Sequence, residues 1–415
     1  MIKVFPRIKK FEKMGIGLFI HWGLYSQLSQ GEWTEYIHHI DRDKYEKLIN
    51  TFSAKDFNAK KIVAVAKQMG AKYIVLTTKH HEGFFLYDTH GLSNFDVMHS
   101  PAHRDLIQEF VSACRDADIA PFFYVATYDW HSELYHDHFN EYLDYLLKSV
   151  KLLCKNYGKI SGFWFDGNWD KKDADWQLPK LYGTIRKYQP KAIIINNTGL
   201  ENGGQIVDPE IDVVTYERQT PNKINHGFNN KYLAGESSIT MNNHWGYAQN
   251  DLNFKSVKEL IENIVHIRGI GANILINIGL TGTGTIPLTN QAIMQEIGKW
   301  TNTYSEAIYN THPLKDVSAS GHTKDLVLGN TNNSYLFIHD LNIVGDKNVV
   351  LGGEGINLRS FTGFFKKIKR IIWLDNNAEL YFMHDPNSGI LTIDTSGYTY
   401  GTDWCVRVAK IIFED

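Results

Sequence analysis

The chain has 415 residues, 43% of them hydrophobic and 21% charged, which is typical of a globular protein with one large domain and a smaller one. Its formal net charge of −3 gives no indication of nucleic acid or an anionic membrane as a partner. The three cysteines are far apart and form no CxxC pair, which argues against a disulfide framework and against a cysteine-based zinc site.

Eight short runs of β-branched or aromatic residues recur through the first three hundred residues and predict β-strands. Helices with one apolar face are predicted between several of them, over 57–69, 106–114 and 257–265. Strands that alternate with helices pair in parallel, so we expect an α/β fold with a (β/α)8-like (TIM-type) barrel over residues 1–310. The links between the fifth, sixth and seventh strands are too short for full helices, which predicts an irregular barrel. The predicted strands are 15–21, 73–78, 121–127, 162–166, 192–197, 212–217, 232–237 and 273–279.

The pattern changes after a further predicted helix near 290–304. Short alternating segments follow, separated by Asn, Asp and Gly residues that favour turns. They predict an antiparallel β-sandwich over residues 311–415. Its predicted strands are 334–340, 347–353, 369–375, 378–384, 389–395 and 404–413.

Several signals of other protein classes are absent from the sequence. No glycine-rich dinucleotide fingerprint follows the first strand, and no phosphate-binding loop with a Lys-Ser/Thr pair occurs. The N-terminal residues are charged throughout, without the apolar core of a signal peptide, and no run approaches the length of a membrane span. We therefore expect a cytoplasmic protein without a membrane partner.

Polar and ionisable residues collect where the predicted strands end. Because a barrel gathers functional groups at the carboxyl ends of its strands, this arrangement predicts one polar pocket. Tryptophans near these positions would give the pocket aromatic walls, which suit the apolar C–H faces of a sugar ring. The strand-end residues are His21, Lys79, His80, His81, Tyr128, Asp166, Asn196, Asn197, Glu217 and Glu236, and the tryptophans are Trp22, Trp33, Trp164 and Trp245.

Asp166 is the most unusual of these residues because it directly follows the aromatic strand segment GFWF. An ionised carboxylate beside so much aromatic surface is costly unless it is paired, although a turn residue that closes a strand is the simpler interpretation. Cleavage of a glycosidic bond with retention needs two carboxyl groups roughly 5–5.5 Å apart. Asp166 is the candidate nucleophile, and Glu217 and Glu236 compete as the acid/base, whose pKa must be raised.

The other candidates also have structural interpretations. His21 could be a core histidine, and Glu217 could form a surface ion pair with the adjacent Arg218. His80 and His81 face opposite sides of a regular strand, so both reach one pocket only where the strand ends or bulges. Taken singly, most of these residues favour the structural interpretation; taken together at the strand ends, they favour a site.

Five segments carry a resemblance to a known family: MGIGLFIHWGLYS, GEWTEY, AKYIVLTTKHHEGF, GFWFDGNW and NNHWGY. In this order they resemble the signature segments of the retaining α-L-fucosidase family of glycoside hydrolases, and GANILINIGLTGTGTIP resembles that family's glycine-rich segment after the last barrel strand. The likeness covers roughly residues 8–310. It implies a barrel with a C-terminal β-sandwich, and an exo-acting enzyme that hydrolyses terminal α-L-fucosyl linkages of oligosaccharides or glycoconjugates through a covalent fucosyl-enzyme intermediate.

The resemblance also implies roles for individual residues. Asp166 matches the family's nucleophile, VTYERQTP nominates Glu217 as the acid/base, and GESSITMNNHWGY contains the rival Glu236. The family's frequent Asn-Asp-Arg reads Asn196-Asn197-Thr198 here, so one basic contact is missing or replaced by Arg218. No metal or other cofactor is implied. The residues implied to bind the sugar are His21, Glu32, Trp33, His80, His81, Tyr128, Trp164, Glu236 and Trp245.

Two functions of other classes compete with this interpretation. A metal-dependent barrel hydrolase could use histidines such as His80 and His81 together with Asp166 as ligands, although the chain has no HxH pair at these positions. A non-catalytic carbohydrate-binding protein could use the same pocket, although two intact carboxylates argue against it. The sequence leaves open the preferred linkage and whether copies of the chain form a homo-oligomer.

Overall fold

The computed structural model describes residues 2–197, 205–321, 324–341, 358–395, 401 and 403–414. By its contacts the chain forms two compact units, one of Met1–Lys255 with Asn273–Gln295 and the other of Ser256–Ala272 with Glu296–Asp415. The domain division at residue 310 stays a prediction, because a grouping by contacts does not decide where a domain begins. Within the described ranges, no helix is both long and apolar enough to cross a membrane.

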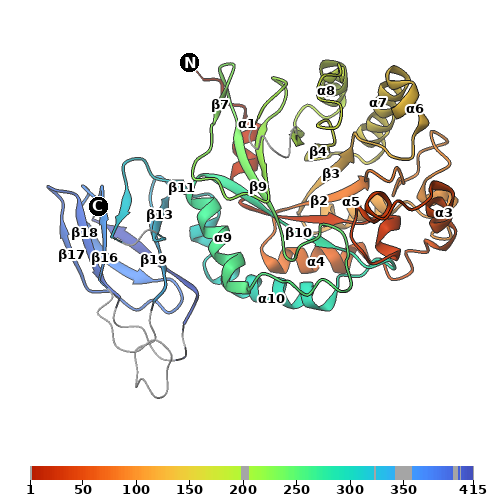
Figure 1. Ribbon diagram of the computed structural model, residues 1–415. Coiled ribbons are helices and arrows are strands. Elements are labelled where there is room, and N and C mark those ends of the chain that lie inside the picture. The colour runs from red at the N-terminus through yellow and green to blue at the C-terminus, as the bar shows by residue number, and fades with distance from the viewer. Residues whose placement is uncertain are drawn as a thin grey trace. The chain divides into compact units, whose positions relative to one another are not determined.

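The eight strands predicted before residue 280 close into a barrel (Figure 1). All of them pair in parallel, in the order β1-β10-β9-β6-β5-β4-β3-β2, which confirms the (β/α)8-like fold. Their carboxyl ends therefore meet at one face of the barrel. The strands are β1 (Ile16–His21), β2 (Tyr73–Lys79), β3 (Ala120–Ala126), β4 (Gly162–Asp166), β5 (Ile193–Asn197), β6 (Val213–Glu217), β9 (Ala234–Thr240) and β10 (Ala272–Gly279).

Side-chain caps begin three of the helices, α4, α5 and α9, among the residues that the structure describes. The side chain of Asn58 accepts a hydrogen bond from the Lys61 N–H at the start of α4, and Gly70, with a φ of 103°, ends that helix in the left-handed conformation. Helices such as α4, α5, α7 and α8 lie outside the barrel strands (Figure 1). The helices are α1 (Pro6–Glu12), α2 (Thr34–Ile37), α3 (Arg42–Glu46), α4 (Ala59–Met69), α5 (Leu106–Asp116), α6 (Glu133–Asp137), α7 (Phe139–Asn156), α8 (Leu178–Tyr188), α9 (Val257–Gly269), α10 (Leu288–Thr303) and α11 (Ser305–Ile308), with 3-10 helices at Leu24–Gln27, Lys47–Thr51 and Val97–His99.

The barrel is irregular between β5 and β9, as the short links predict. Among the residues described there, 205–233, no helix forms, and a hairpin of β7 (Gly227–Phe228) and β8 (Lys231–Tyr232) lies between β6 and β9. This part of the barrel therefore lacks the usual covering helix. Ion pairs of Asp212 connect the neighbouring elements at the amino end of β6.

Two antiparallel sheets follow the barrel and share one apolar core, which confirms the predicted sandwich. The predicted segments 334–340, 369–375, 389–395 and 404–413 form strands; 378–384 contributes only its end, and 347–353 lies outside the described residues. Four further strands were not anticipated, because they are only two to five residues long and give little periodic signal. The sheets are β11 (His312–Pro313), β13 (Leu326–Gly329), β14 (Ser334–His339), β19 (Val406–Phe413) and β16 (Ile368–Trp373), and β12 (Ser318–Ser320), β15 (Leu358–Thr362), β18 (Ile390–Asp394) and β17 (Phe382–Asp385).

A buried carboxylate at the amino end of β6 joins three elements of the barrel. Arg7 of α1 donates to both oxygen atoms of Asp212 at 3.0 and 2.9 Å, and the Arg186 Nη2 atom of α8 donates at 2.7 Å. The Lys231 Nζ atom of the hairpin lies 3.0 Å from the same carboxylate. Burial alone would raise the pKa of Asp212, but the hydrogen bond from Arg7 and the charges of Arg186 and Lys231 outweigh it and hold the pKa below its usual range.

We expect Asp212→Asn to lower the free energy of unfolding by about 3 kcal/mol, because three cations would then surround an uncharged group. Since the pKa of Asp212 is lowered by folding, this contribution is present above the usual carboxyl pKa and is lost as the pH falls through the lowered value. Urea unfolding of the two proteins at neutral pH measures it. Asp144→Asn, which removes an exposed partner of Lys180, is the control and should change little; equal effects would contradict the assignment.

Candidate active site

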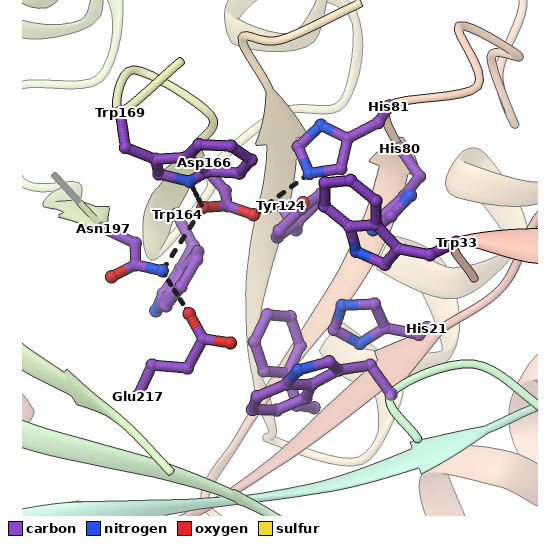
Figure 2. Close-up of a pocket in the computed structure, with 12 residues that line it drawn as sticks. His21, Trp33, His80, His81, Tyr124, Trp164, Asp166, Trp169, Asn197 and Glu217 are labelled. Carbon is purple, nitrogen blue, oxygen red and sulfur yellow. Dashed lines mark hydrogen bonds and ion pairs between the residues drawn. The ribbon is translucent and has the colours of Figure 1, made fainter. Parts of the chain in front are cut away.

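A small cavity opens at the carboxyl ends of the barrel strands (Figure 2). Its volume of about 120 Å³ is below the roughly 300–1,000 Å³ of sites for drug-sized ligands and suits a single small ring. Aromatic side chains form most of the wall, with carboxylates, imidazoles and one amide between them. The lining residues are Phe19, His21, Trp33, His80, His81, Tyr124, Trp164, Asp166, Trp169, Asn197, Glu217 and Trp245.

The backbone fixes the position of Asp166, the last residue of β4. The N–H and the Oγ1 hydroxyl of Thr127 both donate to the Asp166 carbonyl oxygen, at 2.6 and 2.9 Å. Gly167 follows with a φ of 108°, and a Cβ atom there would lie 2.5 Å from the backbone nitrogen of Tyr128. Only glycine fits this turn, so the chain leaves the strand at a fixed point and the Asp166 side chain faces the cavity.

Four side chains surround the carboxylate of Asp166. Trp169 Nε1 and Asn197 Nδ2 donate to Oδ1 at 3.0 and 3.3 Å, while the Tyr124 hydroxyl donates to Oδ2 at 2.9 Å. The His81 Nε2 atom lies 3.4 Å from Oδ2. Burial alone would raise the pKa of Asp166, but His81 and the hydrogen bonds from Trp169 and Tyr124 hold that pKa below its usual range. The group is therefore ionised at neutral pH.

Glu217, the last residue of β6, is the second carboxyl group of the cavity. Burial and the nearby charge of Asp166 raise the pKa of Glu217 to about 7. The Asn197 Nδ2 atom donates to Glu217 Oε2 at 2.6 Å while it also contacts Asp166 Oδ1 at 3.3 Å. Because one nitrogen contacts an oxygen atom of each group, those two oxygen atoms lie less than about 6 Å apart, which is compatible with the roughly 5–5.5 Å spacing of the two carboxyls in retaining glycosidases.

His21, His80 and His81 all line the cavity. Strand β2 ends at Lys79, so the side chains of His80 and His81 do not have to point to opposite faces, as neighbouring residues of a regular strand do. Burial lowers the pKa of His21 to about 3 and lowers that of His80 well below its usual value, so both rings are neutral. His80 Nδ1 is buried without a hydrogen-bond partner among the described residues. His81 Nδ1 donates to the Tyr128 carbonyl oxygen at 3.1 Å. His80 is placed in the cavity wall by its contacts with the His21 and Tyr124 rings, whose centres each lie 5.5 Å from that of His80.

Asn277 of β10 decides which nitrogen of His21 faces the ligand. The Asn277 amide nitrogen donates to the Trp245 carbonyl oxygen at 2.7 Å, so its Oδ1 accepts from His21 Nδ1, also at 2.7 Å. The neutral His21 ring therefore presents Nε2 as an acceptor. Glu32 supports the same loop, because its Oε2 accepts from the Gly246 N–H at 2.7 Å. Glu32 is not a lining residue of the cavity; it holds the loop that carries Trp245.

Two other predicted residues also lie outside the cavity wall. Glu236 is fully buried beneath it, where its two oxygen atoms accept from the Tyr73 hydroxyl at 2.6 Å and from Trp164 Nε1 at 2.9 Å. The ring of Tyr128 packs against Trp169, with the centroids 5.7 Å apart, and does not line the cavity. Glu236 thus orients Trp164, and Tyr128 supports Trp169 from behind.

Comparisons with known proteins identify the family. A profile of the family described as Alpha-L-fucosidase matches residues 3–306. The chain belongs to the α-L-fucosidase family of glycoside hydrolases. Plasma alpha-L-fucosidase of Rattus norvegicus is 27% identical over 328 residues, which cover 73% of this chain and 70% of that protein.

Solved structures of the same family agree in fold along the whole chain. Alpha-L-fucosidase isoenzyme 1 from Paenibacillus thiaminolyticus is 29% identical, covers 99% of both chains and has a TM-score of 0.85. A GH29 alpha-L-fucosidase from Bacteroides thetaiotaomicron, described as a trapped covalent intermediate with 2-fluoro-fucosyl fluoride, shares the fold with a TM-score of 0.78 at 22% identity. The resemblance found in the sequence is thereby confirmed, and membership in the family implies fucosylated glycans as substrates.

Four residues of the fucosidase cavity have no role in the sequence-based prediction. Tyr124 and Phe19 lie on strands and face the barrel interior, where the sequence pattern does not separate a lining residue from a core residue. Trp169 stands three residues after Asp166 within GFWFDGNW, but a loop tryptophan has no fixed direction in the sequence. Asn197 was noted as a strand end and as part of the departure from the family's Asn-Asp-Arg, without a role in the site.

Over the described ranges, no group of three His, Cys, Asp or Glu side chains has the spacing of a metal site.

Asn197→Ala tests the control of the Glu217 pKa. Removing the amide takes away a donor that stabilises ionised Glu217, so the pKa of Glu217 should rise by roughly one unit and activity should persist to higher pH. The pH profile of kcat/KM for a fucosyl disaccharide, whose leaving group needs a proton, measures this shift. Asn196→Ala is the matched control, because Asn196 donates to Tyr182 and Asn168 instead. An unmoved alkaline limb in Asn197→Ala would contradict the prediction.

Proposed function

We propose that this chain is an exo-acting α-L-fucosidase that releases α-L-fucose with retention, with Asp166 as the nucleophile and Glu217 as the acid/base. One observation carries the proposal. Asp166 and Glu217 share the amide nitrogen of Asn197, while their surroundings lower the pKa of the first and raise that of the second to about 7. Two neighbouring carboxyls with diverging pKa values are the acid/base arrangement of a retaining glycosidase. The covalent intermediate trapped in the Bacteroides protein also supports it.

In the first step, a carboxylate oxygen of Asp166 attacks the anomeric carbon of the terminal fucose. The bond from that carbon to the leaving oxygen breaks, and the proton of Glu217 moves to this oxygen. A β-linked fucosyl ester of Asp166 remains. The donors from Tyr124 and Trp169 hold the carboxylate in one orientation before the attack.

In the second step, Glu217 acts as the base. It takes a proton from a water molecule, whose oxygen attacks the anomeric carbon and breaks the ester bond. Asp166 returns to its ionised form, Glu217 is protonated again, and the product is α-L-fucose. When a sugar hydroxyl replaces the water, the same step transfers fucose to that sugar.

The histidines and tryptophans position the sugar. Neutral His21 and His80 offer ring nitrogens to ring hydroxyls without adding a charge near the reacting carbon. Trp164 and Trp245 supply apolar walls for the C–H faces of the ring and for its methyl group. The small volume of the cavity, about 120 Å³, supports the removal of one terminal residue at a time.

Glu217 is preferred over Glu236 because of its position. Both carboxyls have a pKa raised to about 7, Glu236 by burial and Glu217 by burial and Asp166, so the pKa values do not separate them. Glu236 has no surface in the cavity, and both its oxygen atoms are occupied by Tyr73 and Trp164. A cytoplasmic location and a homo-oligomeric state stay predictions.

Asp166→Gly should lower kcat for nitrophenyl α-L-fucoside by ~10³-fold or more, because no covalent intermediate can form. Azide, which can occupy the space of the lost carboxylate, should restore turnover and give β-fucosyl azide, of inverted configuration. Release of nitrophenol and the configuration of the azide product are the measurements. Full activity in the variant would overturn the mechanism.

Glu217→Gly should lose roughly 10²–10⁴-fold in kcat/KM on a fucosyl disaccharide and much less on α-L-fucosyl fluoride, whose leaving group needs no proton. Azide should here attack the fucosyl-enzyme and give α-fucosyl azide, of retained configuration. Glu236→Gln is the control: it should affect both substrates alike, because Glu236 acts only through Trp164. The opposite pattern in the two variants would assign the acid/base to Glu236.

A further inference from the structure

The side of the cavity that receives the leaving group follows from the position of its proton donor. Glu217 must face the oxygen that leaves, so the aglycone, the part of the substrate released with that oxygen, departs past the carboxyl end of β6. Figure 2 shows Glu217 reaching into the pocket from the side opposite His81. The next residue along the chain, Arg218, is exposed and stands at this exit.

Arg218 is held in place although it is exposed. Its φ of 52° lies in the left-handed region, which is uncommon for a residue with a Cβ atom and persists where surrounding contacts determine it. Its N–H donates to the Ser238 carbonyl oxygen at 2.8 Å, and its Nη2 donates to the Asn243 carbonyl oxygen at 2.9 Å. The guanidinium lies 5.0 Å from the centre of the Trp245 ring, in cation–π contact. The charge is therefore fixed at the rim of the cavity.

The charge of Arg218 is also available to a ligand. Among the described residues, no acidic side chain forms an ion pair with Arg218, whereas Arg7, Arg186 and Arg407 each have a carboxylate partner. Within the part of the chain that the structure describes, the Asn243 carbonyl oxygen engages one N–H group of the exposed guanidinium, and the guanidinium has further N–H groups that can donate to a ligand. Arginine binds sulfate and carboxylate groups with two parallel hydrogen bonds.

We propose that Arg218 forms an anionic aglycone subsite, which favours α-L-fucosides whose leaving sugar carries a sulfate or carboxylate group. This rests on the proposed function, because it needs Glu217 on the leaving-group side. The anion of the aglycone pairs with the guanidinium next to Trp245, while the fucose ring lies in the cavity. Since the pair is partly exposed, its contribution falls as salt screens it.

The test compares two fucosyl disaccharides that differ only in a 6-O-sulfate on the N-acetylglucosamine aglycone. At low ionic strength and pH 5.5, the wild type should have a kcat/KM about fivefold higher for the sulfated compound, mainly through KM, and added NaCl should remove the difference. The ratio is the readout because it cancels any disturbance of Trp245 or of the Glu217 pKa.

Arg218→Gln should bring the ratio to about one, and Arg218→Lys should retain part of it. Lys223→Gln, which removes the same charge from an exposed position five residues further on, should leave the ratio of the wild type. A ratio near one in the wild type, or a ratio unchanged by Arg218→Gln, would overturn the subsite. Hydrolysis of α-L-fucosyl fluoride separates this failure from that of the proposed function: its absence would refute the fucosidase assignment itself.

Discussion

Two carboxyl groups that share one amide nitrogen at the mouth of a barrel cannot both be charged without a large cost, and the rest of the site depends on this constraint. The donors decide which group ionises. Asp166 receives three hydrogen bonds and faces His81, whereas Glu217 receives one, from Asn197, and lies in the field of Asp166. The proposed division between nucleophile and acid therefore follows from the surroundings of the two carboxyl groups and not from their residue types.

Buried side chains behind the cavity wall keep it in place. Thr127 holds the backbone of Asp166, Asn277 sets the ring of His21, and Glu32 anchors the loop of Trp245. Glu236 holds the indole of Trp164 from below. None of these side chains lines the cavity, but each fixes a residue that does, which is how a site is held in one geometry before a ligand arrives. Substitution of such a residue should move the side chain that it holds, but it removes no carboxyl or imidazole group from the cavity.

The two ends of the barrel use charge for different purposes. At the amino end, Asp212 joins Arg7, Arg186 and Lys231 where the wall has a hairpin in place of a helix, and the cluster is fully paired. At the carboxyl end, carboxylates, imidazoles and Arg218 are left available to a ligand. This matches the general division of such barrels, in which one face supports the fold and the other carries the reaction. The buried cluster at the amino end stabilises the scaffold that presents the cavity residues at the carboxyl end.

The sequence by itself determined the eight strands and the residues at their carboxyl ends, because apolar runs and turn residues are local signals and parallel pairing brings all these ends to one face. Asp166, Glu217 and the three histidines were found in this way. The strand pattern could not decide between Glu217 and Glu236, because both lie near the ends of predicted strands. In the structure β9 continues to Thr240, so Glu236 lies within the strand and beneath the cavity, whereas Glu217 ends β6 and lines the cavity. The prediction from the sequence chose Tyr128 where Tyr124 lines the wall, and it gave Asn197 no role, because the direction of a side chain at a strand end depends on backbone turns such as Gly167. The order of the chain thus determined which residues meet, and the packing of the barrel decided which of them face the cavity.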